Sequence, residues 1–129
     1  MNQFHHEIHN FPSKLSQEFL EKIFILNQEN TPEVGSLSSI KYLRQLIQLS
    51  SYQFYVVKDN EIKGFIICFR EKSSYDSPNY KFFCNTESKF LYIDRIAIKD
   101  SFRRQGIGKV FMSLLKKLLL QKKYRYVVK

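Results

Sequence analysis

The chain has 129 residues and a mass of 15.5 kDa, which is the size of one domain with a core of its own. Hydrophobic residues make up 43% and aromatic residues 16%, a composition typical of a folded globule and not of a disordered chain. The apolar runs are far too short for a membrane span, no signal-peptide pattern opens the chain, and two cysteines do not form a disulfide framework. We therefore predict a cytoplasmic protein that does not enter a membrane.

The positive charge is concentrated at one end of the chain. The formal net charge is +9, but residues 1–98 carry 11 Lys and Arg against 11 Asp and Glu. Residues 99–129 carry 10 Lys and Arg against Asp100 alone, so they hold the whole excess. This asymmetry favours a phosphate-rich partner, either a phosphorylated small molecule or a nucleic acid. The lysines at positions 116, 117, 122 and 123 are equally compatible with the solvated face of a helix.

The first part of the chain predicts a short strand followed by two helices. Residues 1–11 carry a weak strand signal. Ser13 is a suitable N-cap for a helix over 14–27, whose apolar residues recur at helical spacing. A segment that contains Pro32 breaks this helix, and a second amphipathic helix is expected over 38–49.

Three histidines, His5, His6 and His9, lie near the start of the chain. Their order, His-His-Glu-Ile-His, is not the metalloprotease motif and lacks the spacing of a structural zinc site. We interpret them as incidental surface residues and predict no metal.

A β-hairpin is expected in the middle of the chain. Residues 53–58 and 63–70 are rich in β-branched and aromatic side chains, as strands are. Asp59 and Asn60 between them are typical of a tight hairpin turn. Residues 71–79 then predict a polar loop.

The second half predicts a strand, a long helix and a further strand. Residues 80–84 are expected to form a short extended segment and residues 90–98 the central strand. Residues 107–121 have a broad apolar stripe with polar residues mostly opposite, the pattern of a helix that lies on a sheet. Residues 124–128 begin another strand.

The turn between the central strand and the long helix carries the main functional signal. Its sequence is Arg103-Arg104-Gln105-Gly106-Ile107-Gly108, with Lys109 directly after it. Such a turn points backbone N–H groups and the positive end of the helix dipole at one spot, which makes a cradle for an anion. The arginines and Lys109 add full charges. The pattern therefore predicts a phosphorylated ligand.

This turn resembles the Arg/Gln-x-x-Gly-x-Gly/Ala pyrophosphate loop of the GNAT superfamily of N-acetyltransferases. The apolar strand before it and the amphipathic helix after it have the family's spacing, and the order of expected elements is the family's order. The resemblance implies an α/β (α+β) fold: a mixed, mostly antiparallel twisted sheet flanked by helices.

The resemblance also implies a site for acetyl-coenzyme A. Main-chain N–H groups from Gln105 to Lys109 would hold the pyrophosphate, and glycines would let the backbone approach it closely. Main-chain groups of the strand would pair with the pantetheine arm as though it were another strand. The expected coenzyme-binding residues are Ile96, Ala97, Ile98, Arg103, Arg104, Gln105, Gly106, Ile107, Gly108 and Lys109.

Acetyl transfer to a primary amine needs a group that takes the proton of the ammonium form. Asp94 is our candidate, because the resemblance places an acidic residue or its water relay at this strand position. An equally good interpretation is a structural ion pair of Asp94 with Arg95 or Arg70. We expect the acceptor groove to be bordered by loop residues that bind a cation or line its wall: Glu33, Tyr75, Asp76 and Tyr80.

Relative to the family, the chain stops at Lys129 inside the fifth long strand. The family's next helix, last two strands and the tyrosine that usually protonates the thiol would follow. We predict a single domain over residues 1–129 that is incomplete at its C-terminus. Its open sheet edge would favour a second chain, for example in a homodimer.

The leading hypothesis is therefore an acetyl-CoA-dependent N-acetyltransferase that transfers acetyl directly in a ternary complex, because no cysteine or serine has the setting of a nucleophile. The alternatives are a catalytically impaired CoA-binding or interaction module and a basic nucleic-acid-binding domain. Nucleic-acid binding is the weaker, because it needs exposed aromatic residues and most of these lie in apolar strand or helix patterns.

Overall fold

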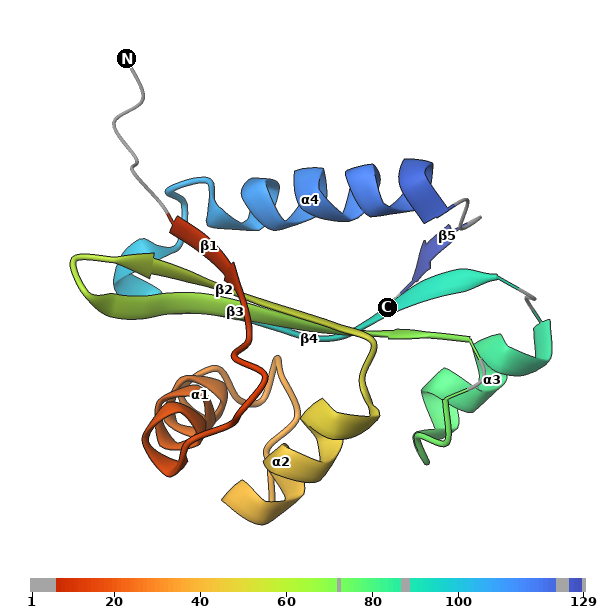
Figure 1. The fold of residues 1–129 in the computed structure, drawn as a ribbon, viewed down its shortest axis with the longest axis horizontal. Helices are drawn as coiled ribbons and strands as arrows, with labels where there is room; N and C mark the ends of the chain where they lie inside the picture. Colours follow the sequence, from red (N-terminus) through yellow and green to blue (C-terminus); the bar gives the residue numbers. More distant parts are fainter. Residues whose placement is uncertain (1–6, 72, 87–88, 123–125, 129) are drawn as a thin grey trace.

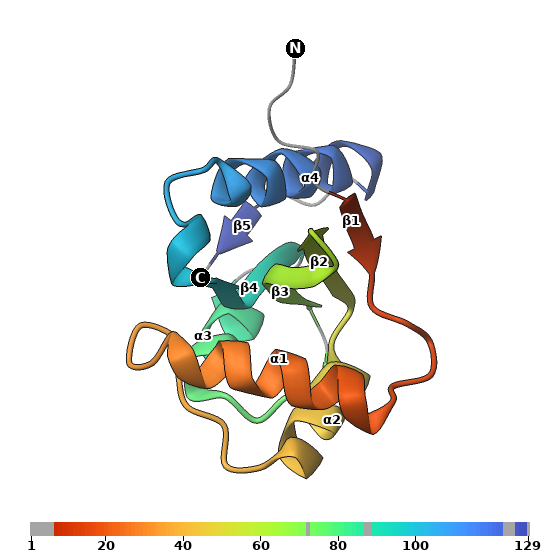
Figure 2. The same ribbon diagram turned by 90° about the vertical axis from the view of Figure 1, so that its left-hand side faces the viewer.

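The computed structural model describes residues 7–71, 73–86, 89–122 and 126–128 (Figure 1). One twisted sheet forms the middle of the molecule, with one long helix on one face and the other helices on the opposite face (Figures 1 and 2). The strands are β1 (Glu7–Asn10), β2 (Tyr52–Lys58), β3 (Glu61–Arg70), β4 (Phe90–Ile98) and β5 (Tyr126–Val128). The helices are α1 (Gln17–Glu29), α2 (Ile40–Leu49), α3 (Pro78–Thr86) and α4 (Ile107–Lys122).

The sheet has the strand order β1-β2-β3-β4-β5. Neighbouring strands from β1 to β4 are antiparallel, whereas β5 runs parallel to β4. This arrangement confirms the mixed, mostly antiparallel sheet that the sequence predicts. The strand expected over 124–128 is β5, and residues 124 and 125 lie outside the described residues.

Two apolar clusters fill the space on the two faces of the sheet. One joins the sheet to α1 and α2 and contains the fully buried residues Leu20, Ile23 and Phe65. The other joins the sheet to α4 through Ile107 and Phe111. Burial of these large side chains is the main term that stabilises the fold.

The first helix begins three residues later than the sequence predicts. The cap is Ser16 and not Ser13: its hydroxyl accepts a hydrogen bond from the N–H of Phe19 at 3.1 Å. Either serine has the right chemistry for a cap, so residue type alone did not choose between them. The second helix is capped by Ser39, which accepts from the N–H of Tyr42 at 3.0 Å.

The prediction of an extended segment over 80–84 is wrong, because these residues lie within α3. Pro78 occupies the first helical position, where it costs no hydrogen bond. The N–H of Lys81 then donates to the carbonyl of Ser77 at 2.9 Å. The aromatic residues that suggested a strand instead pack a helix onto the sheet, with Tyr80 fully buried. Tertiary packing thus overrides the local strand preference.

The hairpin between β2 and β3 is confirmed. Asp59 and Asn60 have φ angles of 54° and 60°. These left-handed conformations at both central residues are those of the turn that best matches the twist of paired strands.

Candidate functional site

A short 3₁₀ turn, Asp100–Phe102, links β4 to the loop before α4. Within that loop Arg104 and Gly106 have φ angles of 70° and 84°. The left-handed region is costly for an arginine and easy for a glycine. These two residues turn the chain so that α4 begins at Ile107, with Gly108 of its first turn close to Ile98 at the end of β4.

The start of α4 presents main-chain donors to one groove. The first helical hydrogen bond that it makes runs from the N–H of Val110 to the carbonyl of Gly106 at 3.0 Å. The N–H groups of Ile107, Gly108 and Lys109 precede it and have no helical carbonyl to bind. They lie at the positive end of the helix dipole, so they suit an anion.

The groove in front of these donors has a volume of about 400 Å³. A Cβ built on Gly106 would meet no atom within 4 Å, and one on Gly108 would meet only Ile98, at 3.8 Å. A Cβ would therefore stand in open space at Gly106 and make only an ordinary contact at Gly108. A diphosphate group fits this cradle, because the glycines leave its main-chain donors accessible. The groove is lined by Ile98, Phe102, Arg103, Arg104, Gly106, Ile107, Gly108 and Lys109.

The three predicted cations of the loop have different settings. Arg104 and Lys109 are exposed and form no ion pair within the described part of the chain. Arg103 is instead bound to the protein: its guanidinium donates to the side chain of Asn30 at 2.7 Å and to the carbonyl of Ile98 at 3.4 Å. It also pairs with Asp100 at 3.3 Å. Arg103 thus fixes the loop against α1.

Phe102 is a lining residue that sequence reasoning missed. The ammonium of Lys63 lies over its ring, 4.3 Å from the ring centroid, in a cation–π contact. Glu61 holds Lys63 at 3.1 Å and Lys99 at 2.6 Å. The hydrogen bonds that Glu61 accepts, from Lys99 first and then from Lys63, lower the pKa of Glu61. The sequence feature that could have indicated Phe102 is that it is an aromatic residue in an otherwise polar turn.

One edge of β4 is open next to the cradle. β5 pairs only with Phe90–Tyr92, so within the described residues no strand covers the rest of that edge. On the other side, the N–H of Lys99 donates to the carbonyl of Lys63 at 2.7 Å. Because main-chain groups alternate between the two edges of a strand, those of Ala97 face β3 and those of Ile96 and Ile98 face away from it.

A β-bulge in β4 determines where Asp94 points. Cys68 pairs with Ile93 and Ile67 pairs with Arg95, so Asp94 is an extra residue without a partner on β3. A bulge of this kind lets two successive side chains point to the same face of the sheet. Asp94 and Arg95 do so, and their side chains retain only 7% and 10% exposure.

Asp94 forms one of the ion pairs that the sequence left open. Its Oδ2 lies 3.3 Å from Nε of Arg95, whereas Arg70 pairs with Glu71. The hydroxyl of Tyr75 donates to Oδ1 of Asp94 at 2.8 Å. Burial raises the pKa of Asp94, and the bond from Tyr75 and the charge of Arg95 oppose this only in part. Burial also raises the pKa of Tyr75, and the charge of Asp94 adds to this.

The last turn of α1 binds two arginines, a feature that sequence reasoning also missed. Asn27 accepts from Nη1 of Arg95 at 3.0 Å, and the same nitrogen donates to the carbonyl of Gly35. Asn30 accepts from Nη2 of Arg103. Both asparagines are buried, at 0% and 6% exposure. The signal was a pair of amides three positions apart at the end of an amphipathic helix, where they share one face.

The expected acceptor residues do not gather in one place. Tyr75 lies beside Asp94. Glu33 and Asp76 are exposed, and Asp76 pairs with Lys81. Tyr80 is fully buried, and its hydroxyl donates to the main-chain carbonyl of Arg70, as core tyrosines commonly do.

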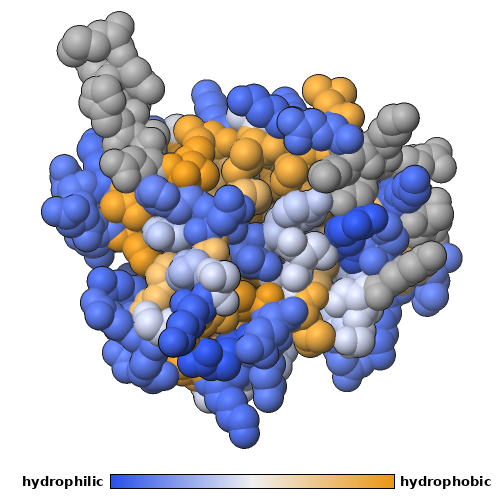
Figure 3. Space-filling model, viewed as in Figure 1, coloured by the Kyte–Doolittle hydropathy of each residue, from blue (hydrophilic) through white to orange (hydrophobic). Residues whose placement is uncertain are grey.

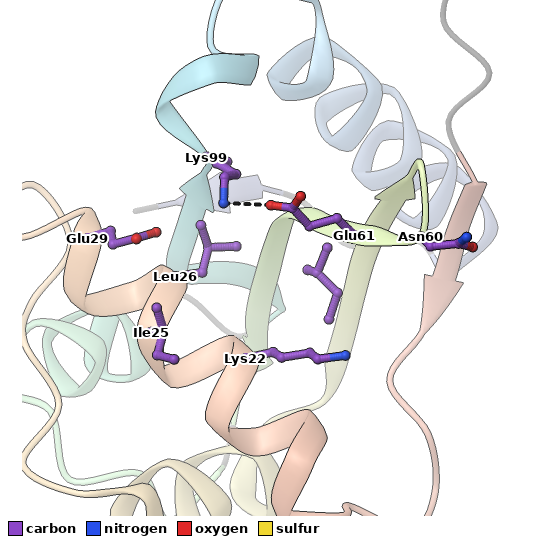
Figure 4. A pocket seen from close by; sticks show the side chains of 8 residues that line it. Lys22, Ile25, Leu26, Glu29, Asn60, Glu61 and Lys99 are labelled. Carbon is purple, nitrogen blue, oxygen red and sulfur yellow. Dashed lines mark ion pairs between the residues drawn. The ribbon is translucent and has the colours of Figure 1, made fainter.

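A second cavity, of about 190 Å³, lies between α1 and the β2–β3 hairpin (Figure 4). Figure 4 shows the ammonium of Lys99 directed at Glu61, with which it forms an ion pair. Lys22 on the same rim pairs with Glu18 at 3.2 Å. Because both lysines of this described lining already face carboxylates, the cavity suits a phosphate poorly. The rim also carries Glu29.

A comparison of the sequence with family models identifies the family of the chain. A model of the acetyltransferase (GNAT) family matches residues 19–129. The chain belongs to this family. It is thus an N-acetyltransferase by family, and members of the family use acetyl-CoA or CoA. No curated protein sequence matches the chain.

Solved structures with the same fold include several acetyltransferases. A ribosomal-protein-alanine N-acetyltransferase from Brucella melitensis biovar Abortus 2308 has a TM-score of 0.64 at 14% identity, with 95% of this chain and 77% of that chain covered. An aminoglycoside acetyltransferase from an uncultured soil metagenomic sample, in complex with sisomicin, has a TM-score of 0.61 at 22% identity, with 96% and 76% covered. An aminoglycoside N-acetyltransferase in complex with CoA has a TM-score of 0.65 at 16% identity, with 96% and 75% covered.

The described residues contain no cluster of three or more His, Cys, Asp or Glu side chains that suits a metal ion, and His5 and His6 lie outside them. None of the described helices has the length and apolar character needed to cross a bilayer.

Proposed function

We propose that the protein transfers the acetyl group of acetyl-CoA to a primary amine by direct attack within a ternary complex. The observation that carries this proposal is the glycine cradle at the start of α4, which opens beside an edge of β4 that no other described strand covers beyond Tyr92. Family membership supports acetyl transfer in general.

The coenzyme, when bound, supplies the acetyl group as an activated thioester. The N–H groups of Ile107, Gly108 and Lys109 hold its pyrophosphate, and the charges of Arg104 and Lys109 neutralise it. The main-chain groups of Ile96 that face the open edge bind the pantetheine arm in the manner of an added strand. Arg103 does not bind the coenzyme directly. It positions the loop through its hydrogen bond to Asn30.

Asp94 takes the proton of the acceptor ammonium, directly or through a water molecule. Its Oδ2 is buried and makes no hydrogen bond within the described residues, although Arg95 lies at ion-pair distance. A carboxylate whose pKa is raised by burial is a better proton acceptor than an exposed one. Burial raises the pKa of the Cys68 thiol, which supports transfer without a cysteine intermediate.

The acceptor class is an amine, and its identity is a question for screening. Sisomicin is bound by one structural neighbour and ribosomal-protein alanine is named for another, so both an aminoglycoside and a peptide with a free amino terminus belong in the first panel. The cytoplasmic location and the homodimer stay predictions.

The proposal is tested first at the level of binding. We expect acetyl-CoA to raise the melting temperature of the protein, since a ligand that binds only the folded state stabilises it. Gly106→Glu places bulk and negative charge in the cradle and should abolish the shift. Gln48→Glu adds the same charge at an exposed position of α2 and serves as the matched control. An unchanged shift in Gly106→Glu would refute the cradle.

Turnover is tested by release of free thiol over the amine panel. Thiol release that depends on the amine supports the proposal. Binding of acetyl-CoA without thiol release for any amine would instead assign the chain to the class of impaired coenzyme-binding modules.

A further inference from the structure

The cavity of Figure 4 lies on the face of the sheet that α1 covers. It is lined by the second half of α1, by the start of β3 with the turn before it, and by Lys99 directly after β4. The described lining shares no residue with the cradle groove and does not include Asp94. The cavity is therefore separate from both parts of the proposed acetyl-transfer site.

One wall of this cavity is aliphatic. It is formed by Ile25 and Leu26 of α1 and by Ile62 of β3. Ile25 keeps 56% exposure, although Leu26 beside it is buried. Figure 3 shows hydrophobic surface among hydrophilic residues in the lower left of the view, where α1 and the hairpin lie. An aliphatic chain laid along this wall would remove Ile25 from water, whereas a flat ring would find no aromatic side chain in the described lining.

The charges of the lining are compensated unequally. Lys22 pairs with Glu18, and Lys99 pairs with Glu61. Glu29 makes neither an ion pair nor a side-chain hydrogen bond with any described residue. The pKa of Lys99 is raised, first by its hydrogen bond to Glu61 and to a smaller degree by the charge of Glu29, so the Glu29 carboxylate acts across the cavity. Within the described lining Glu29 is the carboxylate that is available to a further cation.

We propose that this cavity binds a primary ammonium group at the end of a short aliphatic chain, with the ammonium on Glu29 and the chain along Ile25 and Ile62. Such a ligand uses both features of the site, one carboxylate and one aliphatic wall. An anion would meet lysines that already have carboxylates, and a divalent cation would use none of the apolar wall. The inference does not rest on the proposed function, because no step of acetyl transfer uses this cavity.

Two sources of ligand have this chemistry, a free alkylamine and the side chain of a lysine. Both place the same ammonium at the end of a row of methylenes. The wall and the carboxylate recognise that shared part, so the site is defined by it and the source is decided by experiment.

Glu21 provides an internal comparison. It is exposed on the same helix and has the same charge as Glu29, but it does not line the cavity. If amines were attracted only by acidic residues on the surface of α1, loss of either carboxylate would have the same effect. If the cavity binds the ammonium, only Glu29 affects recognition of that group.

The test compares n-pentylamine, which is protonated at pH 7, with the neutral analogue 1-pentanol. Affinities are measured without coenzyme from the backbone amide resonances of Ile25, Leu26 and Ile62. We expect the native chain to prefer the amine by about three- to fivefold, a typical contribution of an exposed charge pair. Glu29→Gln should remove that preference, whereas Glu21→Gln should keep it.

Chain length tests the aliphatic wall. In the series from ethylamine to pentylamine, each added methylene should tighten binding by about two- to fourfold. Ile25→Ser should flatten this dependence. Leu49→Ser is the matched control, because Leu49 is also an exposed aliphatic residue near the end of a helix but lies outside the cavity lining.

A lysine that is blocked at both its amino and its carboxyl group separates the two sources. Binding that depends on Glu29 assigns the cavity to lysine side chains as well, and binding of the alkylamines alone assigns it to free amines.

The remaining outcomes overturn the inference. The cavity is not an ammonium site if the native chain does not bind pentylamine, if it binds amine and alcohol equally, or if Glu29→Gln and Glu21→Gln behave alike. Loss of the preference in Asp94→Asn would assign the amine to the proposed acceptor position instead. Failure of acetyl-CoA to bind would refute the proposed function and leave this cavity unaffected.

Discussion

Replacement of Asn27 by alanine tests whether α1 holds the arginine that faces Asp94. The side chain of Asn27 makes three hydrogen bonds: from Arg95 at 3.0 Å, to Gly35 at 3.1 Å and to Gln28 at 2.9 Å. The bond from Arg95 is charge-assisted and buried, and such bonds contribute about 1.5–3 kcal/mol. The carbonyl of Gly35 and the amide oxygen of Gln28 keep other donors, so their losses are smaller.

We therefore expect Asn27→Ala to lower the free energy of unfolding by about 3 kcal/mol, out of a total of about 5–15 kcal/mol for a typical domain. The assay is urea denaturation followed by circular dichroism, with the midpoint and the slope fitted separately. Asn30→Ala is the matched variant. Its partner Arg103 is 46% exposed and regains water, so we expect a loss of only about 1–2 kcal/mol.

A double-mutant cycle locates the effect. Arg95→Met should couple energetically to Asn27→Ala and not to Asn30→Ala. Equal losses in the two asparagine variants, or no coupling between Asn27 and Arg95, would show that the contact does not hold the arginine.

Two further predictions concern Asp94. Because the folded state raises its pKa, the stability that it contributes is complete at a pH below the unfolded pKa and is lost as the pH rises through the folded pKa. Asp94→Asn should remove this slope from a plot of unfolding free energy against pH, and should slow acetylation while coenzyme A binding is retained; an unchanged rate would exclude Asp94 as the base. Tyr75→Phe keeps the ring stacked on Phe69 but removes the donor to Oδ1, so it should raise the pKa of Asp94 further. Carbon-13 titration of the carboxyl group measures this, with Tyr80→Phe as the control, and an equal pKa in both variants would contradict it.

The elements that sequence predicted well are those whose signal is local. The span of β4 and the start of α4 follow from an apolar run, a glycine-bearing turn and an amphipathic stripe, all within one stretch of chain. The hairpin at Asp59 and Asn60 is equally local. α3 was missed because its aromatic residues are buried by contacts with the sheet, and residue type alone does not distinguish such a helix from a strand.

The same division holds within the candidate site. The glycine-bearing turn and the start of α4 are local features, and the sequence predicted them. The contacts that orient the site are not local: Arg103 meets Asn30 across 73 positions, Arg95 meets Asn27 across 68, and Tyr75 meets Asp94 across 19. The motif assigned charge to Arg103 but did not reveal that α1 would bind it. Residue patterns therefore predict which groups a site contains more readily than which of them face the ligand.

The bulge at Asp94 has consequences along the rest of β4. Side chains of a regular strand alternate between the two faces of the sheet. Because Tyr92 points to the α1 side, a regular strand would place the side chain of Arg95, three positions later, on the α4 side. That face contains the apolar cluster of Ile107 and Phe111, where burial of a charged guanidinium would be costly. The extra residue shifts the alternation by one position.

Arg95 consequently reaches Asn27, and Ala97 packs on the α1 side while Ile96 and Ile98 pack toward α4. The same shift decides which main-chain groups face the open edge, since side-chain face and edge direction advance together along a strand. The bulge at Asp94, which has no partner on β3, thus determines two things: where the carboxylate proposed to take the proton points, and which main-chain groups lie at the edge proposed to bind the coenzyme. Deletion of Asp94 would therefore disturb both at once, whereas Asp94→Asn would disturb only the first.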